Sequence, residues 1–158
     1  MLDQDHLIDQ PGHDPASAGA DNACWMVLFS AWLVALTATL ASLFIGEVMG
    51  RVPCILCWYQ RIAMFPLPII LGLGLLLVDL RSVRYAMPFA VGGWAVALYH
   101  CLLYWSVVPE GLVPCGQGAS CTQAQLMLVG FLPIPVLSLT AFSLIVVLLI
   151  TPMRRLRT

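Results

Sequence analysis

The stretch CWMVLFSAWLVALTATLASLFI, from Cys24 to Ile45, contains 22 residues and no charged side chain. An α-helix needs about 20 predominantly apolar residues to cross the hydrocarbon core of a bilayer. Because lipid offers no hydrogen-bond partner to the backbone, such a segment crosses as a helix rather than as an isolated strand. The stretch therefore predicts a membrane-spanning helix in an all-α membrane protein.

Three similar stretches follow, and together they predict a four-transmembrane-helix bundle over residues 23–151. The spans are expected at about 24–45, 56–78, 85–106 and 130–150. The composition agrees, because 61% of the residues are hydrophobic and 9% are charged, against about 25% charged in soluble domains. The lipid bilayer is thus the expected surrounding, and the net charge of -1 gives no reason to expect a nucleic-acid partner.

The arginines predict the orientation of the spans. Arg81 and Arg84 lie between the second and third spans, and the segment 152–158 after the fourth span contains three more arginines. The positive-inside rule places both groups in the cytoplasm, and with them both termini. Residues 1–22 contain no Lys or Arg, which argues against a cleaved signal peptide. We expect these residues to form a disordered acidic tail and residues 152–158 to form a basic tail.

The six cysteines divide by their position along the spans. Cys54 and Cys57 open the second span, and Cys115 and Cys121 lie in the connection after the third. This orientation places both pairs at the outer face, where the environment is oxidising. The other two cysteines are expected to be buried, inert thiols: Cys24 and Cys101.

The second and third spans also contain polar side chains with chemical potential. At helical spacing, Cys54, Cys57 and Arg61 share one face, and a helix N-terminus favours the thiolate form of a cysteine. Arg61 can stabilise a thiolate at Cys57 or hold an electronegative ligand beside it, or it can extend to the outer interface. His100 can hydrogen-bond a cofactor carbonyl and pass a proton, or can be satisfied by a neighbouring helix.

Three interpretations of the outer cysteines remain open from their positions. Two neighbouring dithiols can pass electrons by thiol–disulfide exchange, four cysteines can bind zinc, or both pairs can be structural disulfides. An oxidising compartment disfavours the zinc site, so no metal is expected. Structural disulfides leave Arg61 and His100 near the same face unexplained, and the short loop between Cys115 and Cys121 gives such a staple little entropic effect.

The ordered combination of these features resembles the disulfide bond formation protein B (DsbB/BdbC) family, in its short-loop type. CILCWYQR (54–61) opens the second span, and ALYHCLL (97–103) places a histidine late in the third. A cysteine pair follows in the third connection, and IPVLSL (134–139) opens the fourth span. The resemblance covers about residues 23–149.

This resemblance implies a protein-disulfide oxidoreductase that reduces a quinone. Such a protein lies in the bacterial inner membrane with its active cysteines on the periplasmic face. It reoxidises a periplasmic thioredoxin-fold thiol oxidase of the DsbA type, and so supports protein disulfide formation. The electrons pass through two cysteine pairs to a membrane quinone, ubiquinone or menaquinone.

The resemblance also implies a role for each cysteine of the two pairs. Cys115 would form the mixed disulfide with the partner, Cys121 would exchange with Cys54, and Cys57 would contact the quinone. Two further side chains would lie near the quinone: Arg61 and His100.

Two alternatives predict different behaviour. A quinone-coupled protein of the vitamin K epoxide reductase type also combines four helices with two cysteine pairs, but there the loop pair precedes the Cys-x-x-Cys, whereas here it follows. A non-catalytic membrane scaffold with structural disulfides predicts that serine at Cys57 leaves no redox phenotype.

Overall fold

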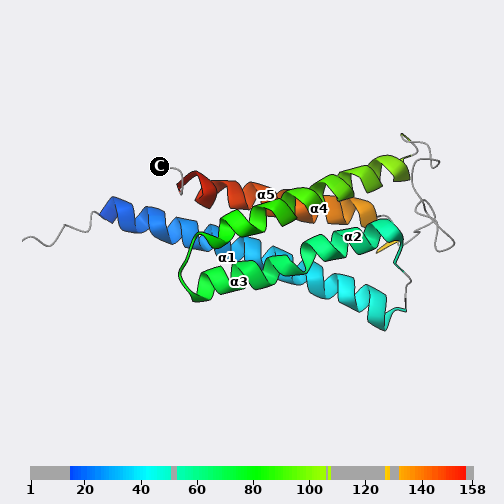
Figure 1. Ribbon diagram of the computed structural model, residues 1–158, viewed down its shortest axis with the longest axis horizontal. Coiled ribbons are helices and arrows are strands. Elements are labelled where there is room, and N and C mark those ends of the chain that lie inside the picture. The colour runs from blue at the N-terminus through cyan, green and yellow to red at the C-terminus, as the bar shows by residue number, and fades with distance from the viewer. Residues whose placement is uncertain (1–14, 51–52, 106, 108–126, 129–131, 156–158) are drawn as a thin grey trace, which may run out of the picture.

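A computed structural model describes residues 15–50, 53–105, 107, 127–128 and 132–155, and these form a bundle of long helices. Figure 1 shows the helices running along the long axis, with the start of α1 and the end of α5 at the same end. The helical elements are α1 (Pro15–Leu43), the π-helix η1 (Phe44–Val48), α2 (Ile55–Met64), α3 (Pro66–Leu76), α4 (Ser82–Tyr104) and α5 (Ile134–Arg155).

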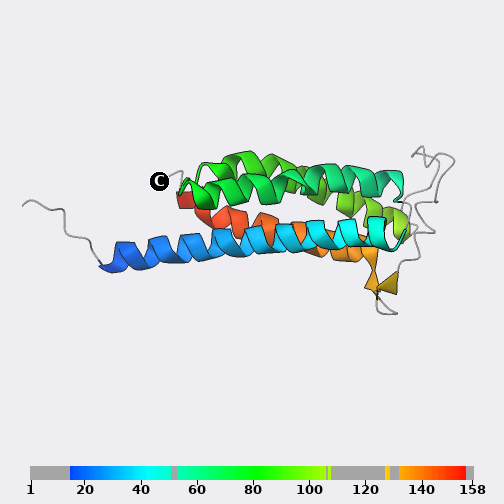
Figure 2. The same cartoon turned by 90° about the horizontal axis from the view of Figure 1, so that it is seen from below.

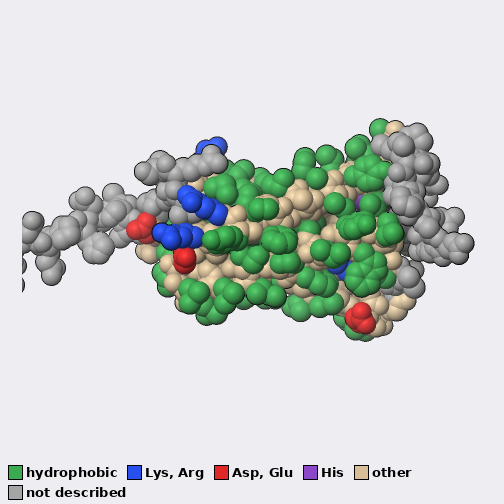
Figure 3. Space-filling view, in the orientation of Figure 1, with side chains coloured by type: hydrophobic (Ala, Val, Ile, Leu, Met, Phe, Trp, Pro, Cys, Tyr) green, Lys and Arg blue, Asp and Glu red, His purple; other side chains and the backbone are tan. Residues whose placement is uncertain are grey.

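Four helical segments of the described chain are long and apolar enough to cross a membrane, which confirms the four-helix fold. They are Asp21–Val48, Ile55–Leu76, Ser82–Tyr104 and Ile134–Arg154. The second segment joins α2 and α3 through Phe65, where Pro66 interrupts the helix because proline has no N–H to donate to the preceding turn. Figure 3 shows hydrophobic side chains covering most of the visible length of the bundle.

The first residues of α1 and α5 differ from the boundaries predicted from the sequence. α1 begins at Pro15 and therefore extends into the segment 1–22, for which the sequence predicts a disordered tail. Alanine-rich sequence favours helix, and proline is tolerated in the first turn, so helix propensity rather than hydropathy sets this end. The fourth helix begins at Ile134, after an antiparallel pairing of β1 (Met127–Leu128) with β2 (Leu132–Pro133).

The core lies where α4 packs on α3 and α5, and where α1 packs on the same two helices. Figure 2 shows α1 and α5 side by side, with α2, α3 and α4 along the other side. Alanines and one glycine, Gly93, face the core from α4, and a Cβ at Gly93 would overlap the ring of Phe142 on α5. Small residues of this kind allow membrane helices to pack closely, since lipid gives no hydrophobic force between them. Close packing of α4 is what carries His100 into the interior.

The connection from α3 to α4 contains a conformation that favours glycine. Leu77 is the C-cap of α3, and Val78 follows it with φ of 53°. The Asp79 N–H then donates to the Gly74 carbonyl at 3.0 Å. This is the Schellman arrangement, in which the left-handed position is usually glycine.

We expect Val78→Gly to raise the free energy of unfolding by about 0.5–1 kcal/mol. A left-handed conformation costs a residue with a Cβ about 1–2 kcal/mol, and glycine removes this cost. Part of the gain is lost because glycine has more conformational entropy in the unfolded chain. Thermal unfolding in detergent would measure the change. Val91→Gly in the middle of α4 is the matched control and should lower stability. A Val78→Gly protein with unchanged or lower stability would contradict the argument.

Candidate active site

The two cysteines of the second span meet at the beginning of α2. Cys54 is the N-cap of this helix, and its sulfur accepts a hydrogen bond from the Cys57 N–H at 3.3 Å. A side chain that caps a helix satisfies one of the free N–H groups of the first turn. The same geometry brings the two sulfurs to 2.6 Å from each other. The two cysteines therefore lie on one face of the helix, as helical spacing predicts, and they can form a disulfide with little movement.

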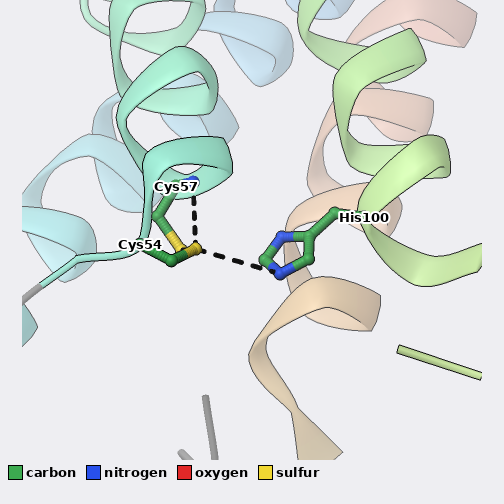
Figure 4. Close-up of side chains that lie close together, drawn as sticks. All are labelled: Cys54, Cys57 and His100. Carbon is green, nitrogen blue, oxygen red and sulfur yellow. Dashed lines mark hydrogen bonds between the residues drawn. The ribbon is translucent and has the colours of Figure 1, made fainter. Parts of the chain in front are cut away.

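His100 reaches this pair from α4. Its side chain is fully buried, and its Nε2 lies 4.0 Å from the Cys54 sulfur. Figure 4 shows Cys54, Cys57 and His100 pointing toward one another across the gap between α2 and α4. The histidine therefore contacts the first cysteine of the pair.

Gln60 completes this arrangement and is not among the site residues predicted from the sequence. It is a buried residue of α2, and its side-chain nitrogen lies 3.4 Å from Nδ1 of His100. The available signal was an amide three residues after Cys57, on the same helix face, inside an apolar span. An unpaired amide is costly in such a place, so a partner could have been expected.

The surroundings of Cys54 favour its thiolate. The Cys57 thiol, as hydrogen-bond donor, is the largest influence that lowers the pKa of Cys54, and burial opposes it. The His100 ring and the Cys57 N–H lower the pKa further, so the net pKa lies well below the ordinary range of a thiol. Since the thiolate is the nucleophile in disulfide exchange, the first cysteine of the motif is prepared to react.

Arg61 connects α2 to the end of α1. Its guanidinium donates a hydrogen bond to the Ser42 carbonyl at 2.7 Å and lies 5.6 Å from the ring centre of Trp58. It also packs on the backbone at Gly46 in η1, where a Cβ would overlap the guanidinium. The side chain is therefore fixed inside the protein by a contact with α1 that the sequence did not reveal.

A cavity of about 710 Å³ lies beside these residues. Residues of α1 and α5, mainly apolar with a few hydroxyl side chains, form most of its wall. Its thiol, amide and ionisable groups come from Cys54, Cys57, Gln60, Arg61 and His100. Ligand sites are typically concave, mostly apolar and supplied with a few polar groups that set orientation. The predicted site residues that the structure describes, Cys54, Cys57, Arg61 and His100, therefore all line one largely apolar cavity.

Comparison with known proteins agrees with this site. The sequence pattern of the family "Disulfide bond formation protein DsbB" matches residues 22–151. The chain belongs to the DsbB family. It is thus a multi-pass membrane protein of disulfide bond formation, consistent with its four spans.

Individual members of the DsbB family show the same similarity. The chain is 48% identical over 132 residues to a probable disulfide formation protein of Metapseudomonas resinovorans, covering 83% of this chain and 92% of that protein. It is 40% identical over 120 residues to disulfide bond formation protein C of Bacillus subtilis (strain 168), covering 76% and 87%. No solved structure matches the chain significantly.

The second cysteine pair of this DsbB-family chain lies outside the described residues. The predictions for Cys115 and Cys121 accordingly stay predictions.

At the first pair, the donor atoms of Cys54, Cys57 and His100 lie within 4.8 Å of one another. Tetrahedral zinc with bonds of about 2.3 Å would hold two sulfurs about 3.7 Å apart. The observed distance between the two sulfurs is 2.6 Å, and the expectation that no metal binds here stays a prediction.

Proposed function

We propose that this DsbB-family protein is a quinone-reducing protein-disulfide oxidoreductase that reoxidises a periplasmic DsbA-like thiol oxidase. The observation that carries the proposal is a dithiol, formed by buried Cys54 and half-buried Cys57, at the wall of an apolar cavity within the membrane bundle. A soluble thiol partner and a lipid-soluble oxidant have to meet at one place, and the start of a membrane span meets both needs. The family match supports disulfide chemistry at this site.

The cavity suits a quinone in size and chemistry. Its volume of about 710 Å³ falls within the usual range of about 300–1,000 Å³ for small-molecule sites. A bound quinone would accept two electrons and two protons. One N–H of Arg61 donates to the Ser42 carbonyl. A guanidinium has five N–H groups, so the others would be available to donate to a carbonyl of the quinone ring. Cys57 and Arg61 line the cavity together and are the proposed contacts.

The position of His100 changes one detail of the proposed contacts. The resemblance to the family implies that this histidine lies near the quinone, and it does line the cavity. Its two ring nitrogens, however, face the Cys54 sulfur and the Gln60 amide. We therefore assign its main effect to Cys54, with quinone contact as a second role.

The proposed electron path begins at the cysteines after the third span. A thiolate of the partner attacks the Cys115–Cys121 disulfide and forms a mixed disulfide with Cys115, which releases Cys121 as a thiolate. The partner's second thiol then displaces Cys115, and the partner leaves oxidised. Cys121 attacks Cys54 of a Cys54–Cys57 disulfide and releases Cys57 as a thiolate beside the cavity. Cys115 then displaces Cys54 from Cys121, which regenerates the Cys115–Cys121 disulfide and leaves Cys54 and Cys57 reduced. A quinone would take this electron pair and two protons, and the Cys54–Cys57 disulfide would form again. One electron pair moves in each exchange, so two thiols are oxidised for each disulfide that is reduced.

The proposed orientation places both termini in the cytoplasm of a bacterium and the dithiol on the periplasmic side of the inner membrane. In Figure 3 most visible basic side chains gather at the end of the bundle where α1 begins and α5 ends. The positive-inside rule favours the cytoplasm for that end. Cys54, at the start of α2, then faces the periplasm.

The proposal is tested by mixing the purified protein with a reduced DsbA-type thiol oxidase and excess ubiquinone or menaquinone, and following quinone absorbance. We expect continuous quinone reduction coupled to oxidation of the partner. Cys115→Ser should stop reduction driven by the partner and spare reduction driven by a small dithiol that reaches Cys54 directly. No reduction by the intact protein, with partner and quinone active in controls, would refute the proposal.

A further inference from the structure

Gln60, His100 and Cys54 form a buried chain of polar contacts, and this chain constrains the hydrogen position on the His100 ring. Gln60 is 7% exposed and His100 is 0% exposed. They come from different helices, α2 and α4, so their contact depends on the bundle rather than on local sequence. A buried polar group left without a partner is costly, so each member constrains the next.

The direction of the hydrogen bonds follows from the atoms that face each other. The amide nitrogen of Gln60 lies 3.4 Å from Nδ1 of His100, and an amide nitrogen can only donate. Nδ1 is then the acceptor, and a neutral imidazole has its hydrogen on the other nitrogen. That nitrogen, Nε2, lies 4.0 Å from the Cys54 sulfur.

We propose that Gln60 is a positioning residue that holds His100 in the Nε2–H tautomer, so that His100 donates a hydrogen bond to the Cys54 sulfur. The sulfur then has up to three donors, with the Cys57 N–H at 3.3 Å and the Cys57 thiol at 2.6 Å. A sulfur with these donors is stabilised as a thiolate. The catalytic meaning of this arrangement depends on the proposed function, whereas the tautomer does not.

No other ionisable group of the cavity wall competes for this role in the described chain. α1 and α5 contribute apolar side chains and hydroxyl groups to the wall, and Arg61 is the one further charged residue there. Arg61 lies on α2 and donates to the Ser42 carbonyl. The opposite orientation of the Gln60 amide would require hydrogen on Nδ1 and would remove the His100 donor from Cys54. The two tautomers thus predict different chemistry at the thiol.

The tautomer can be measured directly in the reduced protein without quinone or partner. Magic-angle-spinning NMR of protein labelled with 13C,15N-histidine in lipid distinguishes a protonated from an unprotonated ring nitrogen, and His100→Phe assigns the signal. We expect hydrogen on Nε2 in the native protein. Gln60→Met should give a mixture of tautomers, and Gln60→Glu should move the hydrogen to Nδ1, because a carboxylate only accepts.

A second readout follows the consequence at Cys54. The rate of its alkylation reports the thiolate fraction, so it should stay high as the pH falls toward 6 in the native protein. Gln60→Met should move the midpoint of the pH–rate profile upward by about one unit, as expected for a weakened hydrogen bond to a charged sulfur. Mass spectrometry identifies the modified cysteine.

A matched control comes from the same cavity. Ser138 lies on its wall and bonds the Pro135 carbonyl of its own helix at 2.9 Å, so Ser138→Ala should leave both readouts unchanged. Unfolding curves of Gln60→Met and Gln60→Glu check that both proteins fold, and either one suffices for the NMR test. Native protein with hydrogen on Nδ1, or a native tautomer and profile retained in Gln60→Met, would overturn the inference. Failure of quinone reduction alone would count against the proposed function only.

Discussion

Replacing Cys57 by serine is expected to lower quinone reduction by at least about 1,000-fold. Cys57 lines the cavity and lies 2.6 Å from its partner sulfur, so it is the thiol from which electrons would leave the chain. A hydroxyl cannot form the disulfide that the two thiols become when they give up this electron pair, and loss of a nucleophile typically removes nearly all turnover. Quinone absorbance with a small dithiol as reductant measures this step without the partner. Cys54→Ser should give the same loss.

Cys101→Ser is the matched control for this experiment. Cys101 is a buried thiol of α4, next to His100 in sequence but absent from the cavity wall. Its replacement should keep turnover within about twofold, because a buried serine can bond a carbonyl of its own helix. Turnover retained in Cys57→Ser would contradict the role of Cys57, whereas no turnover in the native protein and no redox phenotype in Cys57→Ser would favour the scaffold with structural disulfides.

The fold could be predicted because its strongest determinant is local. A stretch such as residues 24–45, without a charge, has few alternatives to a membrane helix. The ends of the helices were harder, since hydropathy says little about them. α1 begins at Pro15 because polar and small residues can also be helical, and α5 begins at Ile134 because residues 132–133 pair as a strand.

The candidate site was predicted as far as one helix determines it. The shared face of Cys54, Cys57 and Arg61 follows from helical spacing, and all three line one cavity. The contacts between helices could not be read in the same way. Gln60 meets His100, and Arg61 meets α1, only after the packing of the bundle has set which faces oppose each other.

Replacing Arg61 by methionine is expected to lower kcat/KM for the quinone by about 100-fold, or about 2.7 kcal/mol. The guanidinium lies on the cavity wall with Cys57, where negative charge forms as electrons leave the thiol. A fixed positive group in an apolar site stabilises such charge more than it would in water. Steady-state quinone reduction over a range of quinone concentrations would measure the loss.

A purely structural Arg61 would behave differently, because its bond to the Ser42 carbonyl at 2.7 Å also ties α2 to α1. Loss of that bond should lower stability by about 1–3 kcal/mol. Gly46→Ala separates the two effects: it keeps the charge but forces the guanidinium away from the backbone of η1. Gly92→Ala, where a Cβ has open space, is its control. If position of the charge matters, Gly46→Ala loses turnover at a temperature where it is fully folded and Gly92→Ala does not. Full turnover in folded Arg61→Met would show that this arginine only connects α2 to α1 and has no role in quinone reduction.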